Sequence, residues 1–271
     1  MNNFFMLIML CVTFAFVAIT CLTEPEKKAS VPVPEEYNIN NRKNYPAFKD
    51  KQLGFERVRI AYLDAKENVT SSLRKNGIEG DGFELFFRIF KQEEAMELWV
   101  KPQNGEKFSL LKTYPFCNNS GKPGPKRKQG DLQIPEGFYE IEVFNPMSSY
   151  FLSLGVNYPN KSDKILGSQT DPGGDIYFHG GCATVGCVPI TDDLIKEVYI
   201  TAVEAKTSGQ DKIPVHIFPA RMTTRNMSPL KRKYPQHAKF WDQLEPGYQF
   251  FEDYKTIPAV KIEANGDYKI D

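Results

Sequence analysis

The sequence has no excess of either charge, because Lys plus Arg and Asp plus Glu each number 34 among 271 residues. A nucleic-acid-binding protein usually carries a basic excess or a basic stripe, so this balance argues against that class of partner. A local basic cluster lies at residues 122–128, in a loop rich in glycine and proline. This cluster is either a solvated loop or a docking surface for an anionic substrate.

Cysteine and histidine are scarce, with five cysteines and three histidines in the chain. So few cysteines argue against a disulfide framework. Two of them lie near the N-terminus, which leaves Cys117, Cys182 and Cys187 in the rest of the chain. This odd number leaves at least one thiol free. A disulfide between Cys182 and Cys187 is one possible pairing.

A long apolar run occupies residues 4–19 and has no Lys or Arg before it. At about 16 residues it is short for a membrane-spanning helix and typical of a signal sequence. Ala18 and Thr20 precede Cys21, which loosely resembles a bacterial lipoprotein signal; an uncleaved membrane anchor is the alternative. Either reading predicts an exported protein of the periplasm or cell envelope, attached to the membrane by an anchor or a lipid.

The chain is expected to divide into four parts. Residues 1–22 form the signal, lipoprotein signal or anchor, and residues 23–47, with Pro32 and Pro34, form a stiff linker. Residues 48–220 form the main domain, which begins with a helix. Residues 221–271 form a C-terminal appendage packed on that domain.

Hydrophobic periodicity predicts an α+β protein, rich in β-structure, with helices at both ends. Apolar spacing indicates a helix over 48–75, closed by Asn76-Gly77, and a Thr191 cap begins another that runs to about residue 206. A third helical segment covers 235–254. The expected strands are 83–90, the hairpin 95–101 and 107–113 around Asn104-Gly105, then 137–144, 150–154, 176–178 and 215–218.

Residues 177–189 contain the parts of a thiol nucleophile and its base. His179 lies eight positions before Cys187, and Gly186 before that cysteine permits a sharp turn with free N–H groups. An imidazole can take the proton of a thiol, and the helix that begins after Thr191 would lower the thiol pKa.

Blander interpretations of the same residues stay open. Cys182 follows two glycines in the same loop and competes with Cys187 as the nucleophile, or is a structural thiol. A zinc site of His179, Cys182 and Cys187 with His216 has plausible ligand types, but its spacing matches none of the common zinc motifs. His216 lies in an apolar strand and is expected to be packed, whereas His237 is expected to be exposed.

A set of motifs, in order over residues 48–260, resembles the YkuD-type L,D-transpeptidases of the YafK/ErfK-like group. The motifs are Tyr114-Pro115-Phe116-Cys117, Ser120-Gly121-Lys122-Pro123-Gly124-Pro125-Lys126, Pro135-Glu136-Gly137-Phe138-Tyr139, Asn157-Tyr158-Pro159-Asn160, His179-Gly180-Gly181-Cys182, Val185-Gly186-Cys187 and Pro214-Val215-His216-Ile217-Phe218-Pro219. The resemblance implies a YkuD-like catalytic domain of mixed sheets that carries a thiol at the mouth of a groove.

The resemblance also implies a cysteine acyltransferase that acts on peptidoglycan stem peptides, with a tetrapeptide as donor and an amine or water as acceptor. It makes Cys187 the nucleophile and His179 the base and then the acid, with the Gly180 carbonyl orienting the imidazole. The N–H groups of Gly186 and Cys187 form the oxyanion hole. No cofactor and no metal are expected, and the substrate-binding residues are expected to be Ser120, Lys122, Lys126, Tyr158, Gly181 and Thr184.

The motif departs from the broad family pattern at the rim of the site. Val185 replaces a histidine before Gly186, and Val188-Pro189 stands where an arginine often follows the cysteine. These departures leave the acyl acceptor open. The alternatives are a carboxypeptidase or amidase that hydrolyses the stem peptide or a peptidoglycan–protein link at the same site, and a catalytically silent wall-binding lipoprotein.

Overall fold

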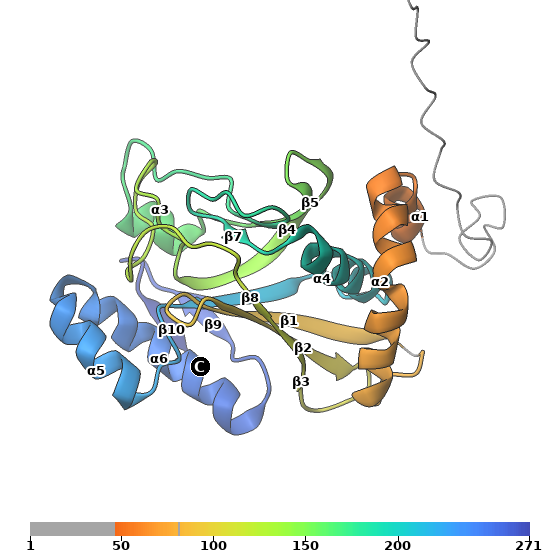
Figure 1. Ribbon diagram of the computed structural model, residues 1–271. Helices are drawn as coiled ribbons and strands as arrows, with labels where there is room; N and C mark the ends of the chain where they lie inside the picture. Colours follow the sequence, from red (N-terminus) through yellow and green to blue (C-terminus); the bar gives the residue numbers. More distant parts are fainter. Residues whose placement is uncertain (1–46, 81) are drawn as a thin grey trace, which may run out of the picture. The chain divides into compact units, whose positions relative to one another are not determined.

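A computed structural model describes residues 47–80 and 82–271 (Figure 1). The predicted signal or anchor and the linker up to residue 46 lie outside the described residues. Among the helices of the described part, none is long and apolar enough to cross a membrane.

A sheet of eight strands forms the centre of the fold. Its order is β3-β2-β1-β8-β4-β5-β6-β7; β1 and β8 run parallel, as do β6 and β7, and the other neighbours are antiparallel. These strands are β1 (Phe83–Phe90), β2 (Ala95–Pro102), β3 (Ser109–Pro115), β4 (Gly137–Ser148), β5 (Phe151–Val156), β6 (Tyr177–His179), β7 (Val188–Pro189) and β8 (Ile213–Phe218). The mixed sheet confirms the predicted α+β class.

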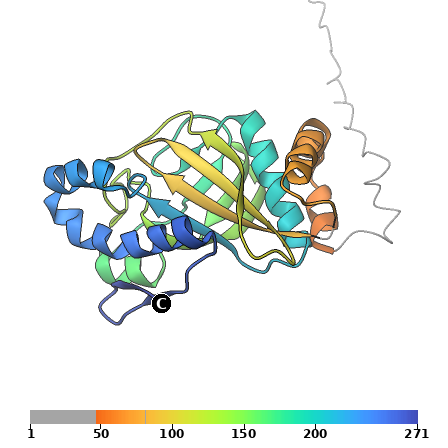
Figure 2. The ribbon, with the colours of Figure 1, turned by 90° about the horizontal axis from the view of Figure 1, so that it is seen from below.

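Helices lie on both sides of this sheet (Figures 1 and 2). They are α1 (Ala47–Leu53), α2 (Glu56–Lys75), α3 (Lys161–Leu166), α4 (Asp192–Thr207), α5 (Thr224–Lys233) and α6 (Ala238–Tyr254), with a 3₁₀ turn, η3 (Pro235–His237), before α6. A small hairpin of β9 (Val260–Ile262) and β10 (Tyr268–Ile270) ends the chain.

The first predicted helix is present but interrupted. Gly54 ends α1, and Phe55 has extended backbone angles (φ −95°, ψ 131°) before α2 begins. The prediction of one continuous helix over 48–75 is therefore wrong, because the helix is broken at residues 54–55. The predicted end is confirmed, since Asn76 is the C-cap and Gly77 has φ 75°.

Helix α4 lies against α2 and one face of the sheet, and it follows the active-site loop directly. Thr191 caps it by accepting a hydrogen bond from the Leu194 N–H at 3.4 Å, as its sequence predicts. Its buried face (Ile195, Val198, Tyr199, Ala202) belongs to the main core together with the inner face of α2. This core fixes where the loop before α4 can lie.

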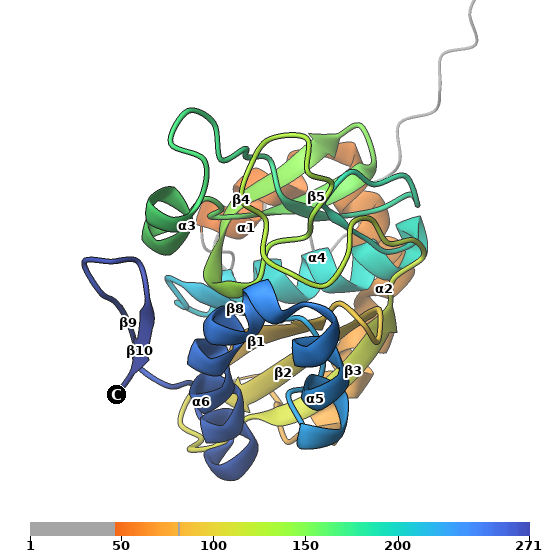
Figure 3. The same ribbon diagram turned by 90° about the vertical axis from the view of Figure 1, so that its left-hand side faces the viewer.

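The C-terminal helices α5 and α6 lie beside the sheet (Figure 3), and a second hydrophobic cluster joins α6 to its strands. Phe90, Phe138 and Phe218 of the strands pack with Trp241 and Tyr248 of α6. The helical segment predicted at 235–254 is confirmed as η3 and α6. Neither α5, which contains Pro229, nor the two short strands that follow α6 was predicted.

The buried carboxylate of Glu136, in the loop between β3 and β4, binds both Lys91 after β1 and Trp241 of α6. Lys91 Nζ donates to Glu136 Oε1 at 3.0 Å and to the carbonyl of Gly124 at 2.7 Å. Trp241 Nε1 donates to the other oxygen of the Glu136 carboxylate at 2.7 Å. Burial lowers the pKa of Lys91, although its carboxylate partner acts in the opposite direction.

The two histidines outside the site differ from each other. His216 is buried with its ring edge-on to Phe86 and Phe138, which confirms the packed role. His237 was expected to be exposed, but it is partly buried, with its ring tilted against that of Trp241 and so close to Gly124 that a Cβ there would clash with it. The prediction for His237 is therefore wrong, because the β3–β4 loop covers it.

Candidate active site

His179 and Cys187 lie at one edge of the sheet, at the end of β6 and just before the adjacent strand β7. His179 is the last residue of β6, and Cys187 comes immediately before β7. The parallel register pairs Phe178 with Val188, which places Cys187 beside Tyr177. The Tyr177 N–H accordingly donates to Cys187 Sγ at 3.4 Å.

Both side chains line one cavity of about 260 Å³. Its other walls come from the β3–β4 loop, the turn after β4, and the loops on either side of β6. The lining residues are Lys126, Gln129, Gly130, Tyr150, Gly174, Asp175, Ala183, Thr184 and Val185, in addition to His179 and Cys187.

The imidazole of His179 is buried and held in one orientation. Its Nδ1 lies 2.6 Å from the Gly180 carbonyl oxygen, the contact on which the expected orienting role depends. Because a carbonyl only accepts, Nδ1 carries the proton, and Nε2 keeps its lone pair. The ring of Tyr150 stacks on the imidazole with centroids 4.6 Å apart.

The environment favours the neutral forms of both the Cys187 thiol and the imidazole. Burial raises the pKa of the Cys187 thiol; the Asp175 carboxylate also raises it, while the Tyr177 N–H and the Lys126 ammonium lower it. Burial lowers the pKa of His179, against the Gly180 hydrogen bond. The lower thiol pKa expected from the start of α4 is therefore wrong, because desolvation outweighs it.

Alkylation of Cys187 should therefore rise with pH and show no plateau near neutrality. Since the thiolate reacts and its pKa is raised, the rate with iodoacetamide should increase about tenfold per pH unit between about pH 6 and 8. Mass spectrometry of the alkylated protein, with Cys187→Ala subtracted as background, measures this rate. A plateau below pH 7 would show a preformed thiolate–imidazolium pair and contradict the expectation.

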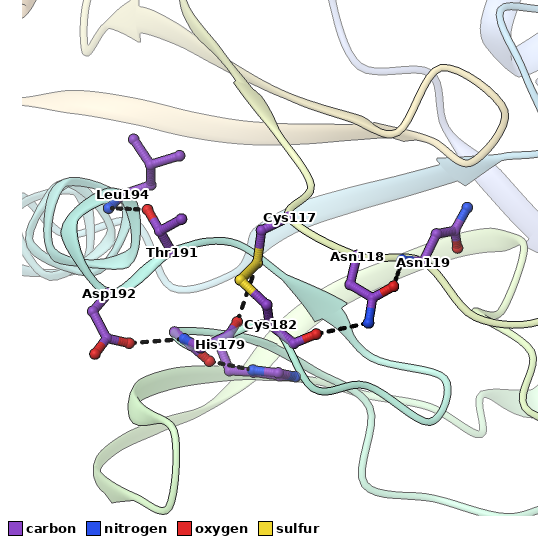
Figure 4. The surroundings of a disulfide bond; sticks show 10 residues. Cys117, Asn118, Asn119, His179, Cys182, Thr191, Asp192 and Leu194 are labelled. Atoms are coloured by element: carbon purple, nitrogen blue, oxygen red, sulfur yellow. Dashed lines mark hydrogen bonds between the residues drawn. A yellow bond between two sulfur atoms is a disulfide. The ribbon is translucent and has the colours of Figure 1, made fainter.

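The other cysteine of the loop is bonded elsewhere. Cys182 forms a disulfide with Cys117, which follows β3 (Figure 4). Cys187 is the free cysteine of the described residues. The Cys182–Cys187 disulfide is thus not the one formed, and the zinc set loses Cys182 as a ligand. Among the residues in the structure, no group of three or more His, Cys, Asp or Glu side chains could hold a metal ion.

Both N–H groups assigned to the oxyanion hole already donate hydrogen bonds to hydroxyl groups. The Gly186 N–H donates to Ser120 Oγ at 2.8 Å, and the Cys187 N–H donates to Thr184 Oγ1 at 3.0 Å. Gly186 has φ 107°, and a Cβ there would lie 2.8 Å from the Gln133 carbonyl oxygen. The turn thus requires glycine, and an oxyanion at these N–H groups would have to displace the hydroxyls.

Among the expected substrate-binding residues, Lys126 and Thr184 line the cavity. Lys126 is not part of a solvated loop, because its buried ammonium donates to Asp131 at 2.8 Å and to the Lys128 carbonyl at 3.0 Å. Ser120 reaches the site through Gly186. The remaining three lie outside the cavity lining: Lys122, Tyr158, whose hydroxyl donates to the Pro172 carbonyl, and Gly181, whose N–H donates to Asp192.

Two contributors to the site were not predicted from the sequence. Tyr150 was placed in a strand, but it precedes β5 in a turn and reaches over His179. Asp175 was not singled out, although its carbonyl accepts the Cys187 thiol at 3.4 Å. Neither carries a local signal, because the contact in each case depends on how β5 and β6 pair.

A family model and a similar protein both relate this chain to the L,D-transpeptidases. The family model for the L,D-transpeptidase catalytic domain, YkuD, matches residues 89–217. The Escherichia coli (strain K12) protein described as "Putative L,D-transpeptidase YafK" is 37% identical over 191 residues, which cover 70% of this chain and 74% of that protein.

Solved structures are similar at lower identity. The helical cell shape determining protein Pgp2 from Campylobacter jejuni aligns with 72% of this chain and 80% of its own, at 17% identity and a TM-score of 0.41. Bdellovibrio bacteriovorus Bd1075 aligns with 63% of this chain and 61% of its own, at 21% identity and a TM-score of 0.36. With the family model and the 37% identical relative taken together, this chain belongs to the YkuD-type L,D-transpeptidase family.

Proposed function

We propose that the protein is a cysteine acyltransferase that acts on peptidoglycan stem peptides. The observation that carries the proposal is the arrangement of His179 and Cys187: both line one cavity, and the Gly180 carbonyl holds the imidazole with Nε2 unprotonated. Membership of the L,D-transpeptidase family supplies the substrate class.

The proposed reaction begins with a proton transfer. His179 Nε2 takes the proton of the Cys187 thiol as Sγ attacks the carbonyl carbon of the third, diamino-acid residue of the stem. The tetrahedral intermediate collapses to a thioester, and the terminal D-alanine leaves with the proton from the imidazolium. An amine or water then attacks the thioester and releases the thiol.

The resting electrostatics support general-base catalysis over a preformed ion pair. Burial disfavours the charged forms of both partners, which favours a proton transfer that accompanies the attack of the sulfur. In the tetrahedral intermediate, the N–H groups of Gly186 and Cys187 replace their hydroxyl partners with the oxyanion. Such a donor typically lowers the barrier by about 2.7–4 kcal/mol.

Location and attachment form part of the same proposal. The apolar run at 4–19 and Cys21 suit export followed by anchoring or lipidation, which would hold the site near the wall. In the substrate path, Lys126 and Thr184 are proposed to contact the stem, and Ser120, Lys122, Tyr158 and Gly181 to shape its surroundings.

Digestion of purified sacculi tests the function. The purified protein should change the muropeptide pattern, and a Cys187→Ala variant should leave it unchanged. New 3–3 cross-links would identify an amine acceptor, whereas loss of D-alanine or release of attached protein would identify water. An unchanged pattern with folded wild-type protein, on sacculi that contain tetrapeptide stems, would contradict the proposal.

A further inference from the structure

A single peptide unit connects the imidazole of His179 to a carboxylate. The Gly180 carbonyl oxygen lies 2.6 Å from His179 Nδ1. The N–H of Gly181 belongs to the same peptide unit and donates to Asp192 Oδ1 at 2.8 Å. Figure 4 shows Asp192 and His179 joined in this way through the backbone between them.

The surroundings leave this peptide unit little freedom. A Cβ on Gly180 would clash with Asp192 Oδ1 and would lie 2.8 Å from the Tyr150 carbonyl oxygen. Gly181 has φ 66°, a conformation that side chains other than glycine rarely adopt. The two glycines thus let the carbonyl face the imidazole while the N–H faces Asp192 at the start of α4.

A carboxylate that accepts from an amide N–H polarises that amide. The carbonyl oxygen at its other end becomes more negative, and a chain of such bonds strengthens each member by about 10–30%. Here the strengthened acceptor is the one that orients His179, and a more negative acceptor favours the imidazolium that forms when Cys187 loses its proton.

We propose that Asp192 is a positioning residue for His179 and acts through the Gly180–Gly181 peptide unit. The carboxylate fixes the tautomer and orientation of the imidazole and stabilises its protonated form. The proposal rests on the proposed role of His179 as the base. It places a carboxylate behind the histidine without any direct contact between the two side chains.

Other charged and titratable groups also surround His179 and must be separated from Asp192 in any test. They face the imidazole from the cavity or stack on it, and they are Cys187, Lys126, Asp175 and Tyr150. None of these four donates to or accepts from the Gly180–Gly181 unit in the hydrogen bonds of the described residues. Substitution of Asp192 leaves all four in place.

Asp193 provides a matched control. It lies in the same first turn of α4, so its removal costs the helix the same negative charge near its N-terminus. Its carboxylate is exposed and accepts from Lys196 Nζ at 2.9 Å instead of from the active-site loop. A change that Asp192→Ala shows and Asp193→Ala does not is therefore specific to the peptide unit.

A nitrogen-15 NMR titration measures the effect directly. The chain has three histidines, so His179 is assigned by a His179→Gln variant. Asp192→Ala should lower the pKa of His179 further and reduce the share of the Nδ1–H tautomer; Asp192→Asn should give a smaller change, and Asp193→Ala none. Equal shifts in Asp192→Ala and Asp193→Ala, or no shift in either, would overturn the proposal.

The rate of Cys187 acylation by a carbapenem provides the second readout. Asp192→Ala should lower the limiting rate about tenfold, the low end of the effect known for carboxylates behind metal-ligating histidines, and move its acidic limb with the His179 pKa. A limiting rate that falls equally at every pH would show a merely structural role. If wild-type protein forms no adduct, the proposed function fails, while the NMR titration still decides the role of Asp192.

Discussion

Replacement of Cys187 by serine should abolish formation of a covalent adduct with a carbapenem. The serine hydroxyl ionises far less readily than a thiol, and His179 is a weak base because burial lowers its pKa. The rate of acylation should fall by about 10³-fold or more. Intact-protein mass spectrometry measures it as the loss of the added mass.

The appropriate control removes sulfur from the same loop without removing the nucleophile. A Cys117→Ala/Cys182→Ala variant keeps Cys187 and should still acquire one adduct, at a reduced rate if its loop is less ordered. Adduct formation by Cys187→Ser, mapped to another residue with the fold intact, would exclude Cys187 as the attacking group. That result would also remove the evidence that favours a cysteine enzyme over a catalytically silent wall-binding protein.

Loss of the Cys117–Cys182 disulfide should lower the stability of the protein strongly. The bond closes a loop of 65 residues, and the entropy of the unfolded chain makes such a closure worth about 4 kcal/mol. The Cys117→Ala/Cys182→Ala variant should therefore unfold at a clearly lower urea concentration than wild-type protein. Wild-type protein treated with a reductant should approach the same midpoint.

Cys187→Ala serves as the matched cysteine substitution here. It removes a thiol from the same loop and leaves the disulfide intact, so its stability should stay within about 1 kcal/mol of wild type. Equal unfolding midpoints for the double variant and wild-type protein would contradict the predicted loss of stability. The same variants also report on catalysis, because Cys182 lies between His179 and Cys187 and its bond to Cys117 restrains the connecting loop.

Local signals in the sequence predicted many of the helices, strands and turns that surround the site. The Thr191 cap, the glycine before Cys187 and the alternation in the strands each act over a few residues, and the structure has the cap and those strands where they were expected. The same is true of the end of α2 at Asn76. Such features are readable because the chain satisfies them with its own neighbours.

The parts that were missed depend on residues far apart in the chain. Cys117 and Cys182 are separated by 65 positions, and no spacing rule selects that pair over Cys182–Cys187. Lys126 looks like a loop cation until Asp131 and the surrounding loop bury it. The raised pKa of Cys187 also comes from tertiary burial, which a nearby helix start does not reveal.

The part of the chain that the family model matches is shorter than the part that the sheet needs for stable packing. The family match ends at residue 217, yet Phe90, Phe138 and Phe218 of the sheet are covered by α6. A truncated fragment without α6 would expose these rings, at about 1.5–3 kcal/mol each. It would also leave the Glu136 carboxylate without its Trp241 donor. Any shortened version made for crystallisation or inhibitor screening should therefore extend past residue 217, where the family model ends, and retain α6.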